Sequence, residues 1–216
     1  MQRKFIITLL IFLFALSGCA PSLIKKAPPD TNIASLGENV LVFGRIRWFD
    51  NEKEKERVTA LQALRIEDMK KGTIKVERVG YDGRFFAVLP RGTYIVHQLD
   101  WFDIWDGPHW LVPKVAFQVA DDQQAYYLGT LVINIRTKRN IIGGLRVKGW
   151  EINIEDEGNE MMEVFRKRYP DHEIKVAKAL MVHDPSIPRI EELENKRVLL
   201  DVLRALSFGV MPMISP

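Results

Sequence analysis

Two segments on either side of Asp82-Gly83 constrain the fold of this 216-residue chain more than any other feature. Residues 73–79 alternate apolar and polar side chains, which is the pattern of a strand with one buried face, and residues 84–89 (RFFAVL) return as a mostly apolar run. An Asp-Gly pair between two such runs is typical of a tight β-hairpin, because both turn residues must accept positive φ angles. We therefore expect the two runs to pair as a hairpin within a mainly β domain.

Further strand patterns precede and follow this pair of segments. They cover residues 40–49, 93–99, 115–119, 125–135 and 145–154, which are rich in β-branched and aromatic side chains. Residues 58–66 are compatible with either a strand or a helix. The pattern predicts a mainly β fold, an antiparallel β-sandwich over residues 38–155.

The last quarter of the chain changes character and predicts helices. Asp156 can cap a helix over residues 157–169, in which Met161, Phe165 and Tyr169 recur every four residues and form one apolar face. Pro170 ends this helix, and residues 190–206 show a second helical pattern. We expect residues 156–216 to form a C-terminal extension with one or two helices packed on the sandwich.

The N-terminus carries a segment that we exclude from the fold. Arg3 and Lys4 precede an apolar run over residues 5–16, which is the layout of a secretory signal. The run is shorter than the roughly 20 residues that a membrane-spanning helix needs. It ends in Leu16-Ser17-Gly18-Cys19, which contains the only cysteine of the chain.

This stretch resembles the lipobox of a bacterial lipoprotein precursor. The resemblance implies that residues 1–18 are a signal peptide, that cleavage falls between Gly18 and Cys19, and that Cys19 carries a covalent lipid. In this family an aspartate after the cysteine favours the inner membrane, so Ala20 implies the outer membrane of a Gram-negative source, with the domain facing the periplasm. The alternative is an ordinary signal peptide with an incidental cysteine. Residues 19–37 then read as the lipidated N-terminus and a linker, unless Leu23, Ile24 and Ile33 dock on the domain.

Composition removes several classes of function. The chain has 31 basic and 28 acidic residues, and two of the basic ones lie in the signal segment, so the mature protein is close to neutral. We therefore expect no nucleic acid as a partner. Once Cys19 is acylated no thiol remains, which excludes disulfides, cysteine nucleophiles and cysteine-based zinc sites. We expect no cofactor other than the covalent lipid on Cys19.

Three short motifs carry a second resemblance, to the carboxypeptidase-regulatory-like or transthyretin-like β-sandwich. They are residues 42–46 (VFGRI), 82–86 (DGRFF) and 89–94 (LPRGTY). The similarity covers roughly residues 38–135. It implies the sandwich fold and a non-catalytic module, since domains of this family usually have no activity of their own.

Residues 100–114 form an aromatic stretch, which we expect to be a loop. It holds three of the five tryptophans, and the candidate binding surface consists of Trp101, Phe102, Trp105, His109 and Trp110. These rings would serve as minor core, as a protein contact or as a sugar contact. Alternation from Leu99 would bury Trp101, so Trp105 and Trp110 are the better surface candidates.

The sequence contains only weak candidates for metal-binding or catalytic sites. Asp100, Asp103 and Asp106 are a weak candidate for a cation site, although a solvated polar edge explains them more simply. The histidines are scattered, and the sequence has no His-Glu-x-x-His or Gly-x-Ser-x-Gly motif. We expect no enzymatic activity, while a triad assembled in space remains open.

The sequence thus predicts a lipid-anchored protein of the cell envelope that acts as a non-catalytic binding or structural module. The expected partners are the membrane, through the lipid, and an envelope protein. The first alternative is a lipoprotein that binds glycan or peptidoglycan through residues 101–110. The second alternative is a cryptic envelope hydrolase.

Overall fold

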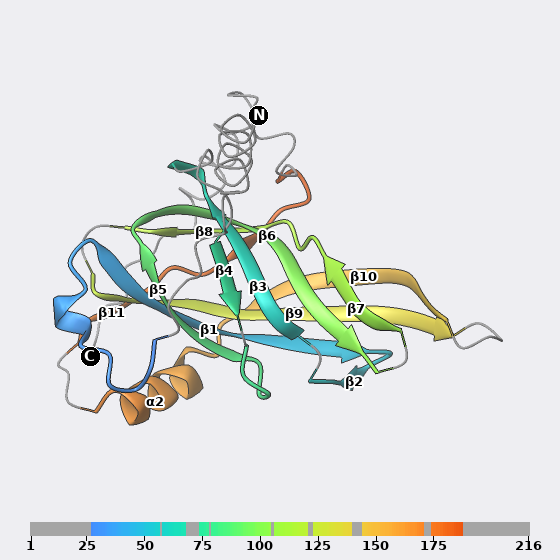
Figure 1. The fold of residues 1–216 in the computed structure, drawn as a ribbon, viewed down its shortest axis with the longest axis horizontal. Coiled ribbons are helices and arrows are strands. Elements are labelled where there is room, and N and C mark those ends of the chain that lie inside the picture. The colour runs from blue at the N-terminus through green and yellow to red at the C-terminus, as the bar shows by residue number, and fades with distance from the viewer. Residues whose placement is uncertain are drawn as a thin grey trace, which may run out of the picture.

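The computed structural model describes residues 27–56, 58–67, 74–77, 79–104, 106–120, 123–139, 144–170 and 174–187. Within these residues the chain forms two six-stranded sheets and one α-helix (Figure 1). The sheets face each other across a shared apolar core, so the predicted mainly β sandwich with a packed helix is confirmed.

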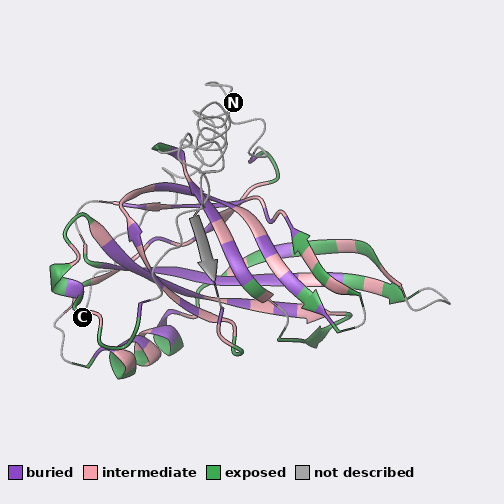
Figure 2. Ribbon diagram, viewed as in Figure 1, coloured by how far each residue is buried: buried purple, intermediate pink, exposed green. Residues whose placement is uncertain are grey.

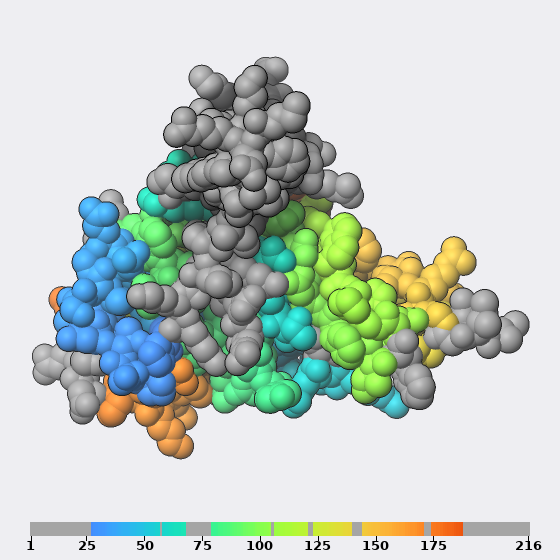
Figure 3. Space-filling model, in the orientation of Figure 1, coloured from blue at the N-terminus to red at the C-terminus, as the bar shows by residue number. Residues whose placement is uncertain are grey.

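The first sheet, called here the β1 sheet, is built around two long central strands. Its strands are β1 (Asn39–Asp50), β2 (Lys53–Glu54), β5 (Arg84–Pro90), β9 (Ala125–Arg139), β10 (Leu145–Glu155) and β11 (Val176–Lys178). The order is β10-β9-β1-β2, with β11 beside β9 and β5 beside β1. β1 and β9 run parallel, whereas β9 and β10 are antiparallel. The β9–β10 ribbon projects past the other sheet at one end of the domain (Figure 3).

The second sheet, the β6 sheet, covers the inner face of the first. Its strands are β3 (Val58–Arg65), β4 (Ile74–Glu77), β6 (Gly92–Asp103), β7 (Gly107–Leu111), β8 (Val115–Val119) and β12 (Val182–His183). β7 and β8 both pair with β6, and β3 links β6 to β4. The segment that was compatible with a strand or a helix, residues 58–66, is thus a strand over most of its length.

The hairpin predicted at Asp82-Gly83 is wrong. β4 pairs with β3 in one sheet and β5 pairs with β1 in the other, so the turn connects the two sheets. Gly83 has φ +77°, and its carbonyl oxygen accepts a hydrogen bond from Ile46 N at 2.9 Å. A Cβ atom at position 83 would collide with the carbonyl oxygen of Ile46. The glycine is therefore needed for close approach to β1 and not for a hairpin turn.

The main core lies between the sheets. Its largest fully buried side chains include Trp48, Tyr94 and Phe117, and the last two rings stack with centroids 5.0 Å apart. Figure 2 shows buried residues following β1 and β9 and exposed residues along β10. β9 is buried on both faces over its first nine residues, as expected for a strand with a packed layer on each side.

The second layer on β9 is the helix α2 (Gly158–Arg168), which packs on the outer face of the β1 sheet. Met161, Phe165 and Tyr169 are buried there, which confirms the predicted apolar face, and Phe165 stacks on Phe43 at 4.7 Å. The cap position is Glu157 without a side-chain cap bond, but Asp156 Oδ1 accepts a hydrogen bond from Gly158 N at 3.1 Å. The described residues include no helix long and apolar enough to cross a bilayer.

The described part of the predicted linker is docked on this same layer. Ala27 is buried, its backbone N donates to Phe86 O, and its carbonyl oxygen accepts hydrogen bonds from Arg168 and Tyr169. A short 3₁₀ helix, η1 (Ile33–Ser35), follows, and Ile33 is buried. Of the two alternatives for residues 19–37, the described part from Ala27 onward takes the docked one, and Ala27 and Ile33 are buried in the cluster that also contains Met161 and Phe165 of α2. The lipobox and the second predicted helix lie outside the described residues.

Candidate functional site

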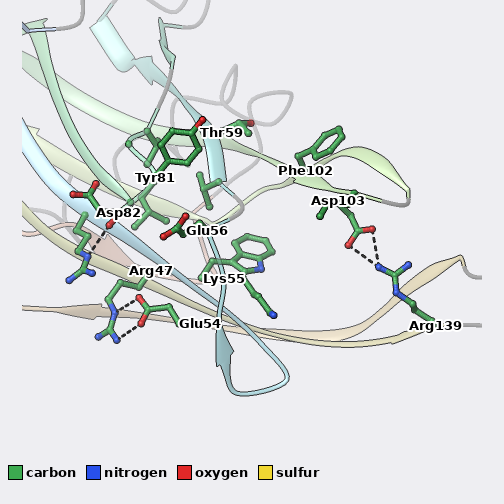
Figure 4. A pocket seen from close by; sticks show the side chains of 18 residues that line it. Arg47, Glu54, Lys55, Glu56, Thr59, Tyr81, Asp82, Phe102, Asp103 and Arg139 are labelled. Atoms are coloured by element: carbon green, nitrogen blue, oxygen red, sulfur yellow. Dashed lines mark hydrogen bonds and ion pairs between the residues drawn. The ribbon is translucent and has the colours of Figure 1, made fainter.

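A cleft of about 1180 Å³ opens at the side of the sandwich, and both sheets contribute to its walls. It is lined by β1 between Arg45 and Trp48, by β2 and the segment that follows it, by the turn before β5, by the end of β6, and by Arg139 of β9. These segments are far apart in the sequence. Figure 4 shows their side chains gathered around one space.

The cleft exists because β1 has no neighbouring strand over part of its edge. β5 pairs with β1 up to Arg45, and β2 pairs only with Phe49 and Asp50. In the interval, Ile46 N donates to Gly83 O at 2.9 Å, and Trp48 O accepts a bond from Lys55 N at 2.7 Å. The edge of β1 is thus closed by single backbone hydrogen bonds, and side chains border the open space beside it.

Trp48 lines the cleft and belongs to an aromatic stack within the core. It is only 2% exposed, its ring lies 5.0 Å from that of Trp101, and Trp101 stacks on His109 at 4.4 Å. The Trp48 Nε1 and His109 Nε2 atoms are buried and have no hydrogen-bond partner in the described part of the chain. An unsatisfied buried polar group costs about 1–3 kcal/mol, so the indole N–H of Trp48 is an unused donor.

Large apolar side chains stand at the rim of the cleft. Tyr81, from the turn before β5, is 90% exposed, and Phe102 and Ile104, at the end of β6, are 49% and 84% exposed. Single exposed apolar residues are common on protein surfaces, but a group around one cavity is typical of a binding site. Tyr81 was not among the candidate site residues predicted from the sequence.

Most charges of the cleft are already paired. Arg47 donates two hydrogen bonds to the Glu54 carboxylate at 2.9 and 3.0 Å, and Arg139 donates two to the buried Asp103 at 3.0 Å (Figure 4). The bond to Glu54 raises the pKa of Arg47, and the same bond lowers the pKa of Glu54.

Two charged side chains of the cleft remain free of such partners. Lys55 and Glu56 follow β2, and neither side chain has a hydrogen bond or ion pair within the described ranges. They are opposite in sign, so the cleft as a whole offers no excess of either charge. The sequence identified them only as part of a solvated charge run.

The predicted aromatic loop is wrong as a loop, because β6 and β7 form a hairpin through most of it. Trp101 faces His109 across the two strands, and Phe102 faces Pro108. Trp101 is buried, as alternation from Leu99 predicted, whereas Trp110 is 67% exposed, as expected for a surface candidate. The alternation of the sequence continues through Asp103, and this was the signal that strand β6 extends past Leu99.

The other tryptophan preferred for the surface, Trp105, lies outside the described residues, as do Gly18 and Cys19. The cleft therefore includes Phe102 from the predicted binding surface. Trp101 lies behind its wall in contact with Trp48, and His109 stacks on Trp101.

The three aspartates of the weak cation candidate are occupied by contacts within the protein. Asp100 accepts hydrogen bonds from Gln62 and Gln98, at 3.0 and 2.6 Å. Arg139 binds Asp103 and also lies 3.5 Å from Asp106 Oδ2, which accepts the backbone N–H of Leu145 at 2.7 Å. No group of three or more His, Cys, Asp or Glu side chains is placed to hold a metal ion among the residues that the structure describes.

A second cluster of charges, which sequence analysis missed, lies near the start of α2. Arg84 binds Glu160 at 2.7 Å, and Arg45 lies 3.6 Å from both Glu157 and Glu160. Glu157 Oε2 also accepts a hydrogen bond from Thr130 at 2.7 Å. These contacts join α2 to the outer face of the β1 sheet and leave the arginines neutralised.

Comparisons with protein-family models, with curated proteins and with solved structures gave no match to this chain. The functional argument therefore rests on the residues themselves.

Proposed function

We propose that this chain is a lipid-anchored protein of the cell envelope, held at the outer membrane through Cys19, and that its sandwich is a non-catalytic module that binds a partner. The anchor follows from the lipobox resemblance at residues 16–19. Binding is supported by one observation, the ring of exposed apolar side chains around the cleft, formed by Tyr81, Phe102 and Ile104.

The physical reason is the cost of leaving these side chains in water. Burying apolar surface contributes roughly 25 cal/mol per Å², and exposed apolar side chains around a cavity gain this energy when a ligand covers them. The rim comes from two segments, the turn before β5, which carries Tyr81, and the end of β6, which carries Phe102 and Ile104, so both segments present apolar side chains to the same occupant.

Site-specific photo-crosslinking in cells tests this proposal. One variant carries the photoreactive residue at Ile104 on the rim, and the matched control carries it at Glu163, which is exposed on α2. We expect a discrete adduct at position 104 and none at position 163. Adducts of equal yield at both positions, or at neither, would contradict a partner-binding rim.

A second candidate function is binding of glycan or peptidoglycan through the β6–β7 hairpin. The observation in its favour is Trp110, which is 67% exposed, on the same side of the hairpin as Phe102. Retention of the protein by purified peptidoglycan, and its loss in Trp110→Ala, would support this function. Retention that is unaffected by the substitution would assign the binding to another surface.

The fold-family resemblance is part of the same proposal. The three motif segments lie in β1, at the start of β5 and at the corner between β5 and β6, and β1 pairs with β5 through Phe43 and Phe86. At the corner, the Tyr94 hydroxyl donates to Pro90 O at 2.5 Å. These contacts support a carboxypeptidase-regulatory-like or transthyretin-like module, and with it a binding role.

A further inference from the structure

We infer that the cleft binds an uncharged oligosaccharide that carries N-acetyl groups. This inference rests on the proposed binding function and names the chemical class of the ligand. It is carried by the charge balance of the cleft, the backbone hydrogen bonds along β1, and the unused donor of Trp48.

Charge balance argues for an uncharged ligand. Arg47 is neutralised by Glu54, and Arg139 by Asp103. Only Lys55 and Glu56 remain without partners among the described residues, and they are opposite in sign. A phosphate, a nucleotide or a strongly charged peptide would therefore find no net attraction here.

Size and surface argue for an amphipathic oligomer. Pockets for single small molecules usually measure about 300–1000 Å³, and this cleft is larger, at about 1180 Å³. Its rim is apolar at Tyr81 and Phe102, while Thr59, Lys55 and Glu56 supply polar groups within it (Figure 4). Flat rings cover the apolar faces of sugars, and hydroxyl-bearing side chains bind their edges.

The alternative uncharged oligomer is an extended peptide, which usually binds by adding a strand to a free sheet edge. That mode is hindered along β1 in this cleft, because Gly83 O accepts from Ile46 N and Lys55 N donates to Trp48 O, so the turn before β5 and the segment after β2 already lie against this edge. Side chains and rings border the rest of the space. Recognition by side chains and rings is the mode that sugars use, so the geometry favours a glycan.

The buried donor narrows the class of glycan. Trp48 Nε1 is buried, lacks a partner and belongs to a residue that lines the cleft beside the apolar side chains of Ile46 and Val79. Because Nε1 is buried, a ligand that uses this donor must displace the side chains that cover it, and it must present an acceptor on a group that tolerates an apolar surrounding. The acetamido group of an N-acetylated sugar does so, since it joins a carbonyl oxygen to a methyl group.

Calorimetric titration of the full-length lipidated protein in detergent micelles tests this inference. The probe is a β-1,4-linked hexamer of N-acetylglucosamine, and the comparison ligand is the glucose hexamer with the same linkage. We expect the N-acetylated hexamer to bind at least tenfold more tightly. Trp48→Phe keeps an aromatic side chain, although a smaller one, and removes the donor, and it should weaken binding about fivefold, because one hydrogen bond contributes about 1 kcal/mol net.

Two further variants serve as checks that a loss of binding reflects the cleft and not a loss of folding. Tyr81→Ala alters a side chain that is 90% exposed, so it should fold normally and weaken binding about fivefold. Trp150→Phe changes an exposed tryptophan on β10 outside the cleft, and binding should remain unchanged. Equal affinity for both hexamers, or binding that neither cleft variant weakens, would overturn the inference.

Failure of this inference differs from failure of the proposed function. If neither hexamer binds while the probe at Ile104 captures a discrete protein, the glycan inference is overturned and the binding function stands. If neither hexamer binds and position 104 gives no adduct, both are overturned.

Discussion

Replacing Gly83 by alanine tests whether the turn between the sheets is held by its close approach to β1. Three effects add. The positive φ of +77° costs an L-residue about 1 kcal/mol. Displacing the turn from Ile46 weakens a 2.9 Å backbone hydrogen bond, at about 1 kcal/mol. Forcing a methyl group against the Ile46 carbonyl adds about 1–3 kcal/mol.

The expected loss in the free energy of unfolding for Gly83→Ala is therefore about 3–5 kcal/mol. That is a large part of the 5–15 kcal/mol typical of a domain. Urea denaturation of the full-length protein, followed by tryptophan fluorescence and by far-UV circular dichroism, measures this loss. Coincident transitions would support two-state analysis.

Gly107 provides a matched control within the same chain. It has a similar φ of +82°, but nothing lies within 4 Å of a Cβ atom placed there. Gly107→Ala should therefore show only the backbone cost of about 1 kcal/mol that was also assigned to Gly83. If the two variants differ by less than about 0.5 kcal/mol, the close approach to β1 contributes nothing measurable and the reasoning is refuted.

Three further predictions concern the anchor and the charged pairs. Cys19→Ala should move the protein from the membrane fraction to the soluble fraction of the cell envelope, because stable attachment depends on the acyl chains; persistent membrane attachment on fractionation would contradict the lipobox assignment. Arg139→Ala leaves the buried Asp103 carboxylate without its main cation and should cost about 1–2 kcal/mol, since the arginine is partly exposed. The exposed Arg146→Ala should stay within about 0.5 kcal/mol in the same urea assay, and equal losses for the two arginines would argue against a structural ion pair. The hydrogen bond from Arg47 lowers the pKa of Glu54. This bond therefore stabilises the fold fully above the ordinary carboxyl pKa of about 4.3. The stabilisation is lost as the pH falls through the lowered pKa of the folded state. The stability difference between wild type and Glu54→Gln should therefore shrink in acid in thermal melts, and a constant difference would contradict the assignment.

The strands were largely predictable because their signal is local. Alternation and β-branched residues located β1, β8, β9 and β10, and spacing of apolar residues located α2. Which strand pairs with which is not determined by the local sequence. The Asp82-Gly83 turn looked like a hairpin, but packing of β5 against β1 outweighed the local turn preference. The parallel pairing of Val42 with Tyr126 joins segments with no local signal for each other.

The cleft was predictable only in fragments. Phe102 was identified as a candidate, and Trp48 was placed in a strand without a functional role. Tyr81 and Glu56 lie in a turn and in a charge run, where sequence gives no sign that they border the same space. They come together because β1 lacks a strand neighbour around Ile46 on the edge away from β9, which is a property of sheet topology and not of any one segment.

The docking of Ala27 limits the reach of the proposed membrane tether. Its backbone is hydrogen-bonded to Phe86 and to the end of α2, so this residue is fixed on the domain. If Cys19 carries the proposed lipid, eight peptide units separate the anchor from Ala27, and a fully extended chain spans at most about 28 Å over that distance. On this proposal the domain would work close to the bilayer surface, and any envelope polymer or protein that it binds would have to come within that layer.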